Sequence, residues 1–303
     1  MKAQTLKAIG GTDNFELTDV PTPAPGPGQV LVRVAVVGIN SLEWKIRNGT
    51  LGGPFAPALP AILGKEFAGT VEALGEGATG LAVGDRVAGF ADSGVYAQYA
   101  VARPASLARL PDDLSFERAA TLPVAVETAS RGIDELGVQP GWTVVVNGAA
   151  GGVGTAAVQL LVKRGVMVIG TASTSNHAYL AGLGAIPVAY GAGVADRIRA
   201  LAPRGVDAVF DVAGHGFAAT AIALTGDPER VLSIADFEAA SLGIRVSSGS
   251  NTPSAASFAA VLPLAATGEF RTEIDRTYAL ADIAAAHAQS EAGHTRGKII
   301  VTV

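Results

Sequence analysis

The chain has 303 residues, of which 49% are hydrophobic and 16% charged, so it can form a full core and two domains. The formal net charge is −5, aromatic residues make up 6%, and no run of Lys or Arg occurs, which argues against a nucleic-acid partner. The absence of cysteine excludes disulfides, thiolate zinc sites, iron–sulfur clusters and a cysteine nucleophile.

The first residues contain no apolar signal core, so the sequence predicts a cytoplasmic protein. Residues 136–162 carry no charge, but Pro140, Asn147 and a glycine cluster interrupt them. A bilayer-spanning helix needs a continuous apolar stretch, and these residues do not provide one. No membrane segment is therefore expected.

Residues 1–118 contain short runs of alternating or β-branched residues separated by turn signals. Strands are predicted at 29–39, 69–75, 84–90 and 96–103, and the Pro/Gly-rich stretch 21–29 is predicted to be a turn. Strands this short and this closely spaced indicate a β-rich, barrel-like unit.

The pattern changes near residue 115, where Ser115 is predicted to be the N-cap of a helix over 115–133. From Gly141 onward, strands predicted at 143–146, 166–172, 186–190, 206–213, 230–235 and 244–249 alternate with helices near 152–164, 176–183, 194–201 and 217–224. This alternation predicts an α/β fold with a parallel sheet covered by helices. The final strand, 297–303, has no helix after it and is expected to pair back into the first domain.

A glycine-rich turn, GAAGGVG, lies between the strand at 143–146 and the helix at 152–164. Gly154 would allow close helix–strand packing, and Gly151 would let the backbone approach a pyrophosphate. Amide groups at the helix start would face the phosphates, aided by the helix dipole. Such turns also occur for packing alone, but the strand–turn–helix context favours dinucleotide binding. The predicted pyrophosphate contacts are Gly148, Gly151, Gly152, Val153 and Gly154.

The residues after the next strand bear on the choice between NAD and NADP. An acidic side chain about 20 residues beyond the glycines would bind the ribose 2′-hydroxyl of NAD. Residues 171–177, TASTSNH, contain no acid, which permits a 2′-phosphate, although they contain no Arg or Lys either. Ser173 and His177 are the predicted donors to the 2′ group, and NADPH is favoured. The alternative is an ordinary helix-capping cluster.

Several segments together carry a resemblance to a known family. They are GINSLEWKIRNG (38–49), LPAILGKEFAGTVEALGEGATGLAVGDRVAGF (59–90), GVYAQYAV (94–101), LPVAVETA (122–129), VNGAAGGVGTAAVQL (146–160) and HTRGKIIVTV (294–303). On these motifs the chain resembles, nearly end to end, a medium-chain dehydrogenase/reductase of the quinone oxidoreductase (zeta-crystallin-like) branch.

The resemblance implies a GroES-like catalytic domain formed by 1–118 plus 268–303. It also implies a Rossmann doubly wound dinucleotide-binding domain at 119–267. The implied activity is two-electron reduction of a quinone, enone or enal by NADPH, with a small apolar carbonyl compound or quinone as substrate. The implied assembly is a homodimer or a larger homo-oligomer.

The chain departs from the zinc-dependent relatives at their metal site. Those relatives have a Cys where this chain has Asn40, and a His-Glu pair where it has Lys65 and Glu66. No metal is therefore expected, and Lys65 and Glu66 are predicted to form an ion pair in its place; the alternative is a catalytic role for these two residues. Glu127 replaces a residue that is typically apolar or Gly in relatives, and the sequence offers no reason for it.

Without a metal, the oxygen that gains charge during hydride transfer needs hydrogen-bond donors or a cation. Asn40 is the first candidate, because the resemblance places it beside the nicotinamide ribose and the substrate; the alternative is an Asn turn at a strand end. Lys45 is a candidate electrophile or proton donor, or else a solvated charge on a short helix. Tyr96 is a third candidate, although its alternating strand favours packing. Glu43 either orients Lys45 or caps the helix.

The resemblance also assigns cofactor contacts outside the glycine-rich turn. Thr128 resembles the threonine near the nicotinamide amide, and Tyr190 matches a position on the adenosine phosphate side. Later strands of a parallel sheet end where a cofactor lies across the sheet edge. The remaining predicted cofactor residues are Asn40, Ala213, Gly214, Ile234 and Lys298.

Two other functions stay open. One is a pathway-specific enoyl or ketone reductase of secondary metabolism, which the sequence cannot separate from the first. The other is an NADPH-binding sensor or structural protein without turnover. It stays open because two residues near the site depart from the family pattern: Lys45 stands where some of the reductases that the chain resembles have Tyr, and Glu127 where relatives have an apolar residue or Gly.

Overall fold

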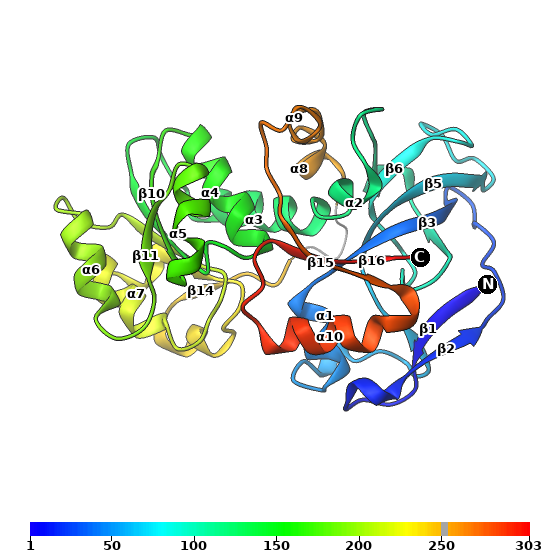
Figure 1. Ribbon diagram of the computed structural model, residues 1–303, viewed down its shortest axis with the longest axis horizontal. Helices are drawn as coiled ribbons and strands as arrows, with labels where there is room; N and C mark the ends of the chain where they lie inside the picture. The colour runs from blue at the N-terminus through cyan, green and yellow to red at the C-terminus, as the bar shows by residue number, and fades with distance from the viewer. Residues whose placement is uncertain (250–253) are drawn as a thin grey trace. The chain divides into compact units, whose positions relative to one another are not determined.

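The computed structural model describes residues 1–249 and 254–303, and Figure 1 follows them from the N- to the C-terminus. The chain forms two compact units. Unit 1 consists of Met1–Val124 and Thr252–Val303, and unit 2 of Ala125–Asn251. The assignment of a catalytic and a dinucleotide-binding domain to the predicted ranges stays a prediction.

Unit 1 is built mainly of β-strands in two sheets. The larger has the order β15-β16-β3-β5-β6-β8, with β7 also paired to β3, and comprises β3 (Val30–Ile39), β5 (Glu66–Leu74), β6 (Arg86–Phe90), β7 (Tyr99–Ala102), β8 (Leu107–Arg109), β15 (Ile274–Ala279) and β16 (Lys298–Thr302). The smaller has the order β2-β1-β4, with β1 (Lys2–Leu6), β2 (Phe15–Asp19) and β4 (Ala61–Ile62). β16 pairs antiparallel with β3, with Val301 opposite Val37, which confirms that the last strand returns to the first part of the chain.

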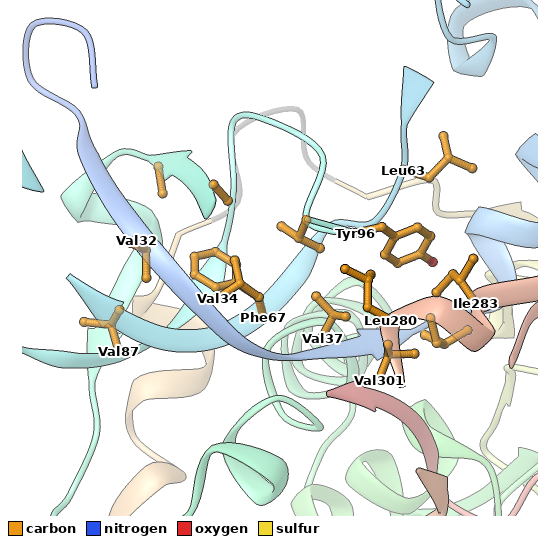
Figure 2. Close-up of a cluster of buried hydrophobic side chains, with 14 of the residues drawn as sticks. Val32, Val34, Val37, Leu63, Phe67, Val87, Tyr96, Leu280, Ile283 and Val301 are labelled. Carbon is orange, nitrogen blue, oxygen red and sulfur yellow. The ribbon is translucent and has the colours of Figure 1, made fainter. Parts of the chain in front are cut away.

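The core of unit 1 lies against β3, whose buried face changes along the strand (Figure 2). Val32 and Val34 point into the core, and so does Val37. This change from even to odd positions follows from a shift of register against β5 between Val34 and Val36. A bulge of this kind inserts one residue and so reverses which side chains face inward. Asn40 directly follows β3, so the bulge also affects the side of the strand on which Asn40 lies.

Helices of unit 1 are short. They are α1 (Ser41–Arg47), α2 (Phe116–Ala119), α8 (Ala256–Ala259), α9 (Leu262–Thr267) and α10 (Ile283–Ala292). The helix predicted from Ser115 begins as expected, because the Ser115 hydroxyl oxygen accepts the Arg118 N–H at 3.3 Å. It ends after one turn, and α3 (Pro123–Glu135) begins with a proline, a residue suited to the first position of a helix.

Unit 2 contains a parallel sheet of six strands in the order β11-β10-β9-β12-β13-β14. The strands are β9 (Thr143–Asn147), β10 (Met167–Ala172), β11 (Ile186–Ala189), β12 (Ala208–Asp211), β13 (Val231–Ser233) and β14 (Arg245–Val246), joined through α4 (Gly152–Lys163), α5 (His177–Gly182), α6 (Val194–Leu201) and α7 (Ala218–Thr225). Counted from β9, this is the 3-2-1-4-5-6 order of a doubly wound Rossmann sheet. The predicted α/β fold is confirmed.

Both faces of this sheet are covered, as expected for parallel strands. Val145, Ile169 and Val209 lie in one apolar cluster with residues of α6 and α7. On the opposite face, the α3 glycine Gly132 lies against the Phe210 ring. The carboxyl ends of the strands, where a doubly wound sheet binds ligands, are left to the connecting turns.

Short 3₁₀ helices occur at Thr12–Asn14, Gly53–Phe55, Pro104–Ser106, Thr174–Asn176, Pro228–Arg230, Glu238–Leu242 and Leu280–Asp282. Throughout residues 1–249 and 254–303, every helix is too short or too polar to cross a membrane.

Candidate functional site

The turn between β9 and α4 consists of residues 148–151. Gly148 has a backbone φ of +84°, a left-handed conformation that favours glycine. A Cβ atom at Gly154 would collide with the backbone of Gly148 and Ala149, so this glycine lets α4 approach the end of β9. A Cβ at Gly151 would meet only the Gly148 carbonyl oxygen, at 3.6 Å. Packing therefore accounts for Gly148 and Gly154, whereas the space beside Gly151 is open.

The first turn of α4 offers backbone donors at this open space. The Thr155 N–H is bonded to the Gly151 carbonyl at 2.8 Å, so the helical ladder begins there. The N–H groups of Gly152, Val153 and Gly154 precede that bond and have no acceptor within the helix. Such groups, together with the helix dipole, favour an anion. The turn therefore fits the pyrophosphate of a dinucleotide.

The turn after β10 contains the predicted 2′-site residues. The Ser173 and Ser175 hydroxyl oxygens are 2.9 Å apart, and Asn176 Nδ2 donates to Ser173 Oγ at 3.1 Å, so part of this cluster is bonded to itself. The Nε2 atom of His177 is buried and has no hydrogen-bond partner within the described residues. A buried polar atom without a partner is uncommon, and a ligand oxygen would satisfy it.

A cation that the sequence prediction missed lies at the end of β11. Arg197, on the first turns of α6, donates to the carbonyls of Ala189 and Ala192, both at 2.8 Å. β11 is the neighbour of β10 in the sheet, and Tyr190 follows β11 with half of its surface exposed. Residues 171–181 contain no Lys or Arg, whereas the helix after the next strand supplies Arg197.

The structure gives a reason for Glu127. Its carboxylate accepts from Arg131 Nε at 2.9 Å and from the Thr128 hydroxyl at 3.2 Å. Arg131 also donates to the Ser247 hydroxyl. Glu127 therefore orients the Thr128 hydroxyl. The contact between Thr128 and the nicotinamide amide stays a prediction.

Polar side chains lie at or next to the carboxyl ends of four neighbouring strands of the parallel sheet, another feature that the sequence prediction missed. Thr171, Asn147, Asp211 and Ser233 are all buried and are joined by hydrogen bonds. Ala213, Gly214 and Ile234, predicted to contact the cofactor, lie in the turns that follow Asp211 and Ser233. The sequence did carry a signal, because each of these apolar strands has a polar residue at or next to its carboxyl end.

A second polar cluster lies in unit 1, where β3 ends and α1 begins. Asn40 Nδ2 donates to Glu43 Oε1 at 3.2 Å and to Glu66 Oε1 at 3.0 Å. Lys298 Nζ donates to Asn40 Oδ1 at 2.5 Å and also to Glu66. Glu43, Glu66 and Lys298 are buried, and Asn40 is partly exposed. Side chains from three segments of unit 1, α1, β5 and β16, thus converge on one amide group.

These partners determine the orientation of the Asn40 amide. The carbonyl oxygen faces an ammonium and the NH₂ group faces two carboxylates. The reverse orientation would place donor against donor and acceptor against acceptor. Since both N–H groups are bonded within the cluster, the second lone pair of Oδ1 is what Asn40 offers to a ligand.

The predicted ion pair between Lys65 and Glu66 is wrong. Lys65 is exposed, and Glu66 pairs with Lys298 from the last strand. Successive residues of an extended chain point to opposite sides, so Lys65 and Glu66 face apart. The other Glu66 oxygen accepts the Val124 N–H at 2.8 Å. Gly38 makes room for this carboxylate, because a Cβ there would lie 2.5 Å from Glu66 Oε1.

Burial raises the pKa of Glu43 to about 7; the negative charge of Glu66 acts in the same direction, and Lys298 and the hydrogen bond from Asn40 oppose it. Glu43 Oε2 accepts the Asn40 backbone N–H at 2.8 Å, so the side chain also caps α1. The cluster thus holds a carboxyl that gains or loses a proton near neutral pH.

Tyr96 and Lys45 lie in different surroundings. Tyr96 is fully buried in the core of unit 1 (Figure 2), and its hydroxyl is 3.0 Å from His287 Nε2. Burial raises the pKa of Tyr96 well above its usual value, so the phenol keeps its proton at neutral pH. Lys45 Nζ lies 5.7 Å from the centre of the Trp44 ring. Catalytic roles for both residues stay predictions.

The cluster does not fit a zinc ion. Asn40 and Lys65 stand at positions where the family's zinc-dependent members have Cys and His, and the Lys298 ammonium already contacts Glu66. In the described part of the chain, no three His, Asp or Glu side chains are grouped so that they could hold a metal.

Two family models match the chain, the alcohol dehydrogenase GroES-like domain over residues 26–112 and the zinc-binding dehydrogenase over residues 183–301. Among curated proteins, the synaptic vesicle membrane protein VAT-1 homolog of Rattus norvegicus is 38% identical over 220 residues, which cover 71% of this chain and 54% of that protein. The chain thus spans about half the length of this relative.

Solved structures match over the full length. The quinone oxidoreductase from Coxiella burnetii superposes with a TM-score of 0.90 and 31% identity, covering 100% of this chain and 99% of that chain. A mycobacterial protein solved in complex with NADPH superposes with a TM-score of 0.86 and 30% identity, covering 100% of both chains.

Proposed function

The chain belongs to the medium-chain dehydrogenase/reductase superfamily, in its quinone oxidoreductase branch, and we propose that it is an NADPH-dependent oxidoreductase that reduces a quinone or the activated C=C bond of an enone or enal. The observation that carries this proposal is the turn at 148–154. It combines open space beside Gly151 with the amide groups at the start of α4 that have no acceptor within the helix, in a sheet of Rossmann order.

Binding of NADPH rather than NADH is supported by the charges around the 2′ site. The turn after β10 holds no carboxylate that would repel a 2′-phosphate, and the guanidinium of Arg197 lies at the end of the adjacent strand. The unpartnered Nε2 of His177 offers a further contact. The mycobacterial neighbour was solved in complex with NADPH, which agrees with this choice.

NADPH, when bound, supplies the hydride. The residues of the chain bind and orient the reactants, and they stabilise charge. With its N–H groups committed, Asn40 accepts a hydroxyl through Oδ1, while Lys298 and Glu66 hold the amide in place. Charge that develops on the substrate oxygen needs a cation or donor, and Lys45 on α1 is the proposed source.

The reaction is proposed to be zinc-independent. Asn40 and Glu66 stand where zinc-dependent relatives have metal ligands, and the Lys298 ammonium contacts both. The Lys298 ammonium, paired with Glu66, thus stands at this place instead of a metal ion. The homodimeric state and the quinone, enone or enal substrate are part of the same proposal.

The test begins with fluorescence titration of NADPH and NADH. We expect a lower dissociation constant for NADPH, and equal or inverted constants would remove the cofactor choice. NADPH oxidation is then followed with a panel of quinones, enones, enals and ketones. We expect turnover with quinones or enones, and Asn40→Ala to lower turnover more than NADPH affinity.

Two results would favour the other functions. Turnover confined to one ketone or enoyl thioester would indicate a pathway-specific reductase. Tight NADPH binding with no turnover on any acceptor would indicate a sensor or structural protein. The latter is kept open because the VAT-1 homolog carries a name that states no reaction.

A further inference from the structure

We propose that Asp211 is a positioning residue for dinucleotide binding, because it anchors a ladder of buried side chains that fixes three turns at the carboxyl edge of the parallel sheet. The carboxyl-edge ladder consists of Thr171, Asn147, Asp211 and Ser233. This inference rests on the proposed binding of NADPH and names residues that support it without touching it.

The ladder crosses four adjacent strands at one level. Thr171 of β10 is the register partner of Asn147 of β9, which is the partner of Asp211 of β12. Asp211 is in turn the partner of Ser233 of β13. Three of the four are the last residues of their strands, so the ladder lies where the connecting turns begin.

Hydrogen bonds run through the ladder toward Asp211. The Thr171 hydroxyl donates to Asn147 Oδ1 at 2.7 Å, and Asn147 Nδ2 donates to Asp211 Oδ1 at 2.8 Å. From the other side, the Ser233 hydroxyl donates to Asp211 Oδ2 at 2.8 Å. Each side chain can take only one orientation, because its donors and acceptors are assigned by its neighbours.

Each turn is tied to the ladder by backbone N–H groups. Gly148, which opens the glycine-rich turn, donates to Thr171 Oγ1 at 3.0 Å. Gly214, after β12, donates to Asp211 Oδ1 at 2.8 Å, and Ala213 does so at 3.2 Å. Asp236, after β13, donates to Ser233 Oγ at 3.0 Å. The turns predicted to contact the cofactor therefore share one support.

The buried position of Asp211 is unfavourable for the stability of the fold. It is 2% exposed, and no cation lies within ion-pair distance of it in the described residues. Burial of a carboxylate is unfavourable unless hydrogen bonds compensate, and Asp211 accepts four. An apolar residue would pack here without that requirement. Buried polar networks that break the apolar rule are expected where a site must be held in shape.

The test compares Asp211→Asn with Asp207→Asn. Asn keeps the size of the side chain but offers one acceptor oxygen in place of two, so a ladder donor loses its partner. Asp207 is the matched control: its carboxylate accepts the Thr143 N–H at 2.7 Å, at the opposite ends of the same strands β9 and β12. Ser233→Ala is a milder second variant in case Asp211→Asn folds poorly.

The first measurement is amide hydrogen exchange in the protein without cofactor. We expect Asp211→Asn to speed exchange at Gly214, which it binds directly, and also at Gly148, to which the hydrogen bonds of Asn147 and Thr171 link it. We expect Asp207→Asn to leave both unchanged. Unchanged exchange at Gly148 in Asp211→Asn would overturn the ladder, whatever the protein binds.

The second measurement is affinity. We expect Asp211→Asn to raise the dissociation constant for NADPH about tenfold, which is the effect of leaving one buried polar group without a hydrogen bond. We expect Asp207→Asn to change this constant by less than about twofold. Equal weakening by both variants would mean that Asp211 acts only through general stability. If the unsubstituted protein bound neither NADPH nor NADH, the proposed function would fail, and exchange at Gly148 would still decide whether the ladder exists.

Discussion

Glu43 shows how one side chain can serve both structure and proton chemistry. Its carboxylate caps α1 through the Asn40 N–H, and burial raises its pKa from 4.5 to about 7. An unfolded chain loses this proton near pH 4.5, whereas the folded chain keeps it until about pH 7. Between these values the folded state binds more protons, so the contribution of Glu43 to stability falls as the pH rises.

We therefore expect Glu43→Gln to remove this dependence. The contribution lost by the unsubstituted protein between pH 4.5 and pH 7 is on the order of 3 kcal/mol in the free energy of unfolding. Gln keeps the size of the side chain and one acceptor for the Asn40 N–H. The measurement is urea unfolding of both proteins from pH 4.5 to pH 8.

His287 also titrates and adds its own pH dependence to the free energy of unfolding. Burial lowers the pKa of His287 to about 3, so its own contribution to stability falls as the pH drops from about 6.5 toward 3. Both proteins retain His287, and its contribution cancels in their difference. A difference that stays constant across the range would show that Glu43 is ionised throughout.

At the scale of elements, the turn between β9 and α4 assigns different tasks to neighbouring glycines. Gly154 is needed by the fold, because any side chain there would collide with the turn backbone. Gly151 has an ordinary φ of −74° and open space beside it, so the fold tolerates a larger residue. The two glycines therefore separate packing from ligand binding.

We expect Gly154→Ala to lower the free energy of unfolding by about 1–3 kcal/mol, which is the usual effect of overpacking. We expect it to weaken the binding of NADPH as well. Gly151→Ala should leave stability within about 0.5 kcal/mol, since the new methyl group faces open space. It should nevertheless weaken NADPH, because the methyl group occupies the approach to the backbone. Thermal unfolding and fluorescence titration of both variants provide the measurements. If Gly151→Ala left the affinity for NADPH unchanged, the pyrophosphate would not bind beside Gly151.

Elements with their own periodicity could be predicted from the sequence, and contacts between distant segments could not. The helix expected at 194–201 is α6, with the same bounds, because an amphipathic pattern and flanking glycines are local signals. The partner of Glu66 was wrongly predicted as its neighbour Lys65, since Lys298 lies 232 residues away in sequence. Arg197 and Asp211 were missed for the same reason: their importance depends on which strands lie side by side.

At the scale of the whole molecule, the parallel sheet of unit 2 has an open edge. β14 pairs with β13 on one side, and the described residues provide no strand for its other side. Beside β14 lies the 3₁₀ helix Glu238–Leu242, whose last residue, Leu242, is 51% exposed. Phe237, directly before this helix, is 37% exposed. Exposed strand edges with apolar neighbours are sites of association between chains. The sheet has a second edge strand, β11, at its other end. Because of the apolar side chains beside β14, we expect the predicted homodimer to form through the β14 edge.

We expect light scattering to give twice the chain mass of 30.4 kDa, and Leu242→Lys to give a monomer. Association would bury the lysine charge against apolar surface, which is unfavourable without a partner charge. Val83→Lys is the control, because Val83 is 62% exposed and belongs to unit 1, whereas this sheet belongs to unit 2. A monomeric unsubstituted protein, or a Leu242→Lys dimer with unchanged mass, would contradict the assignment. Circular dichroism of both variants distinguishes loss of association from loss of folding.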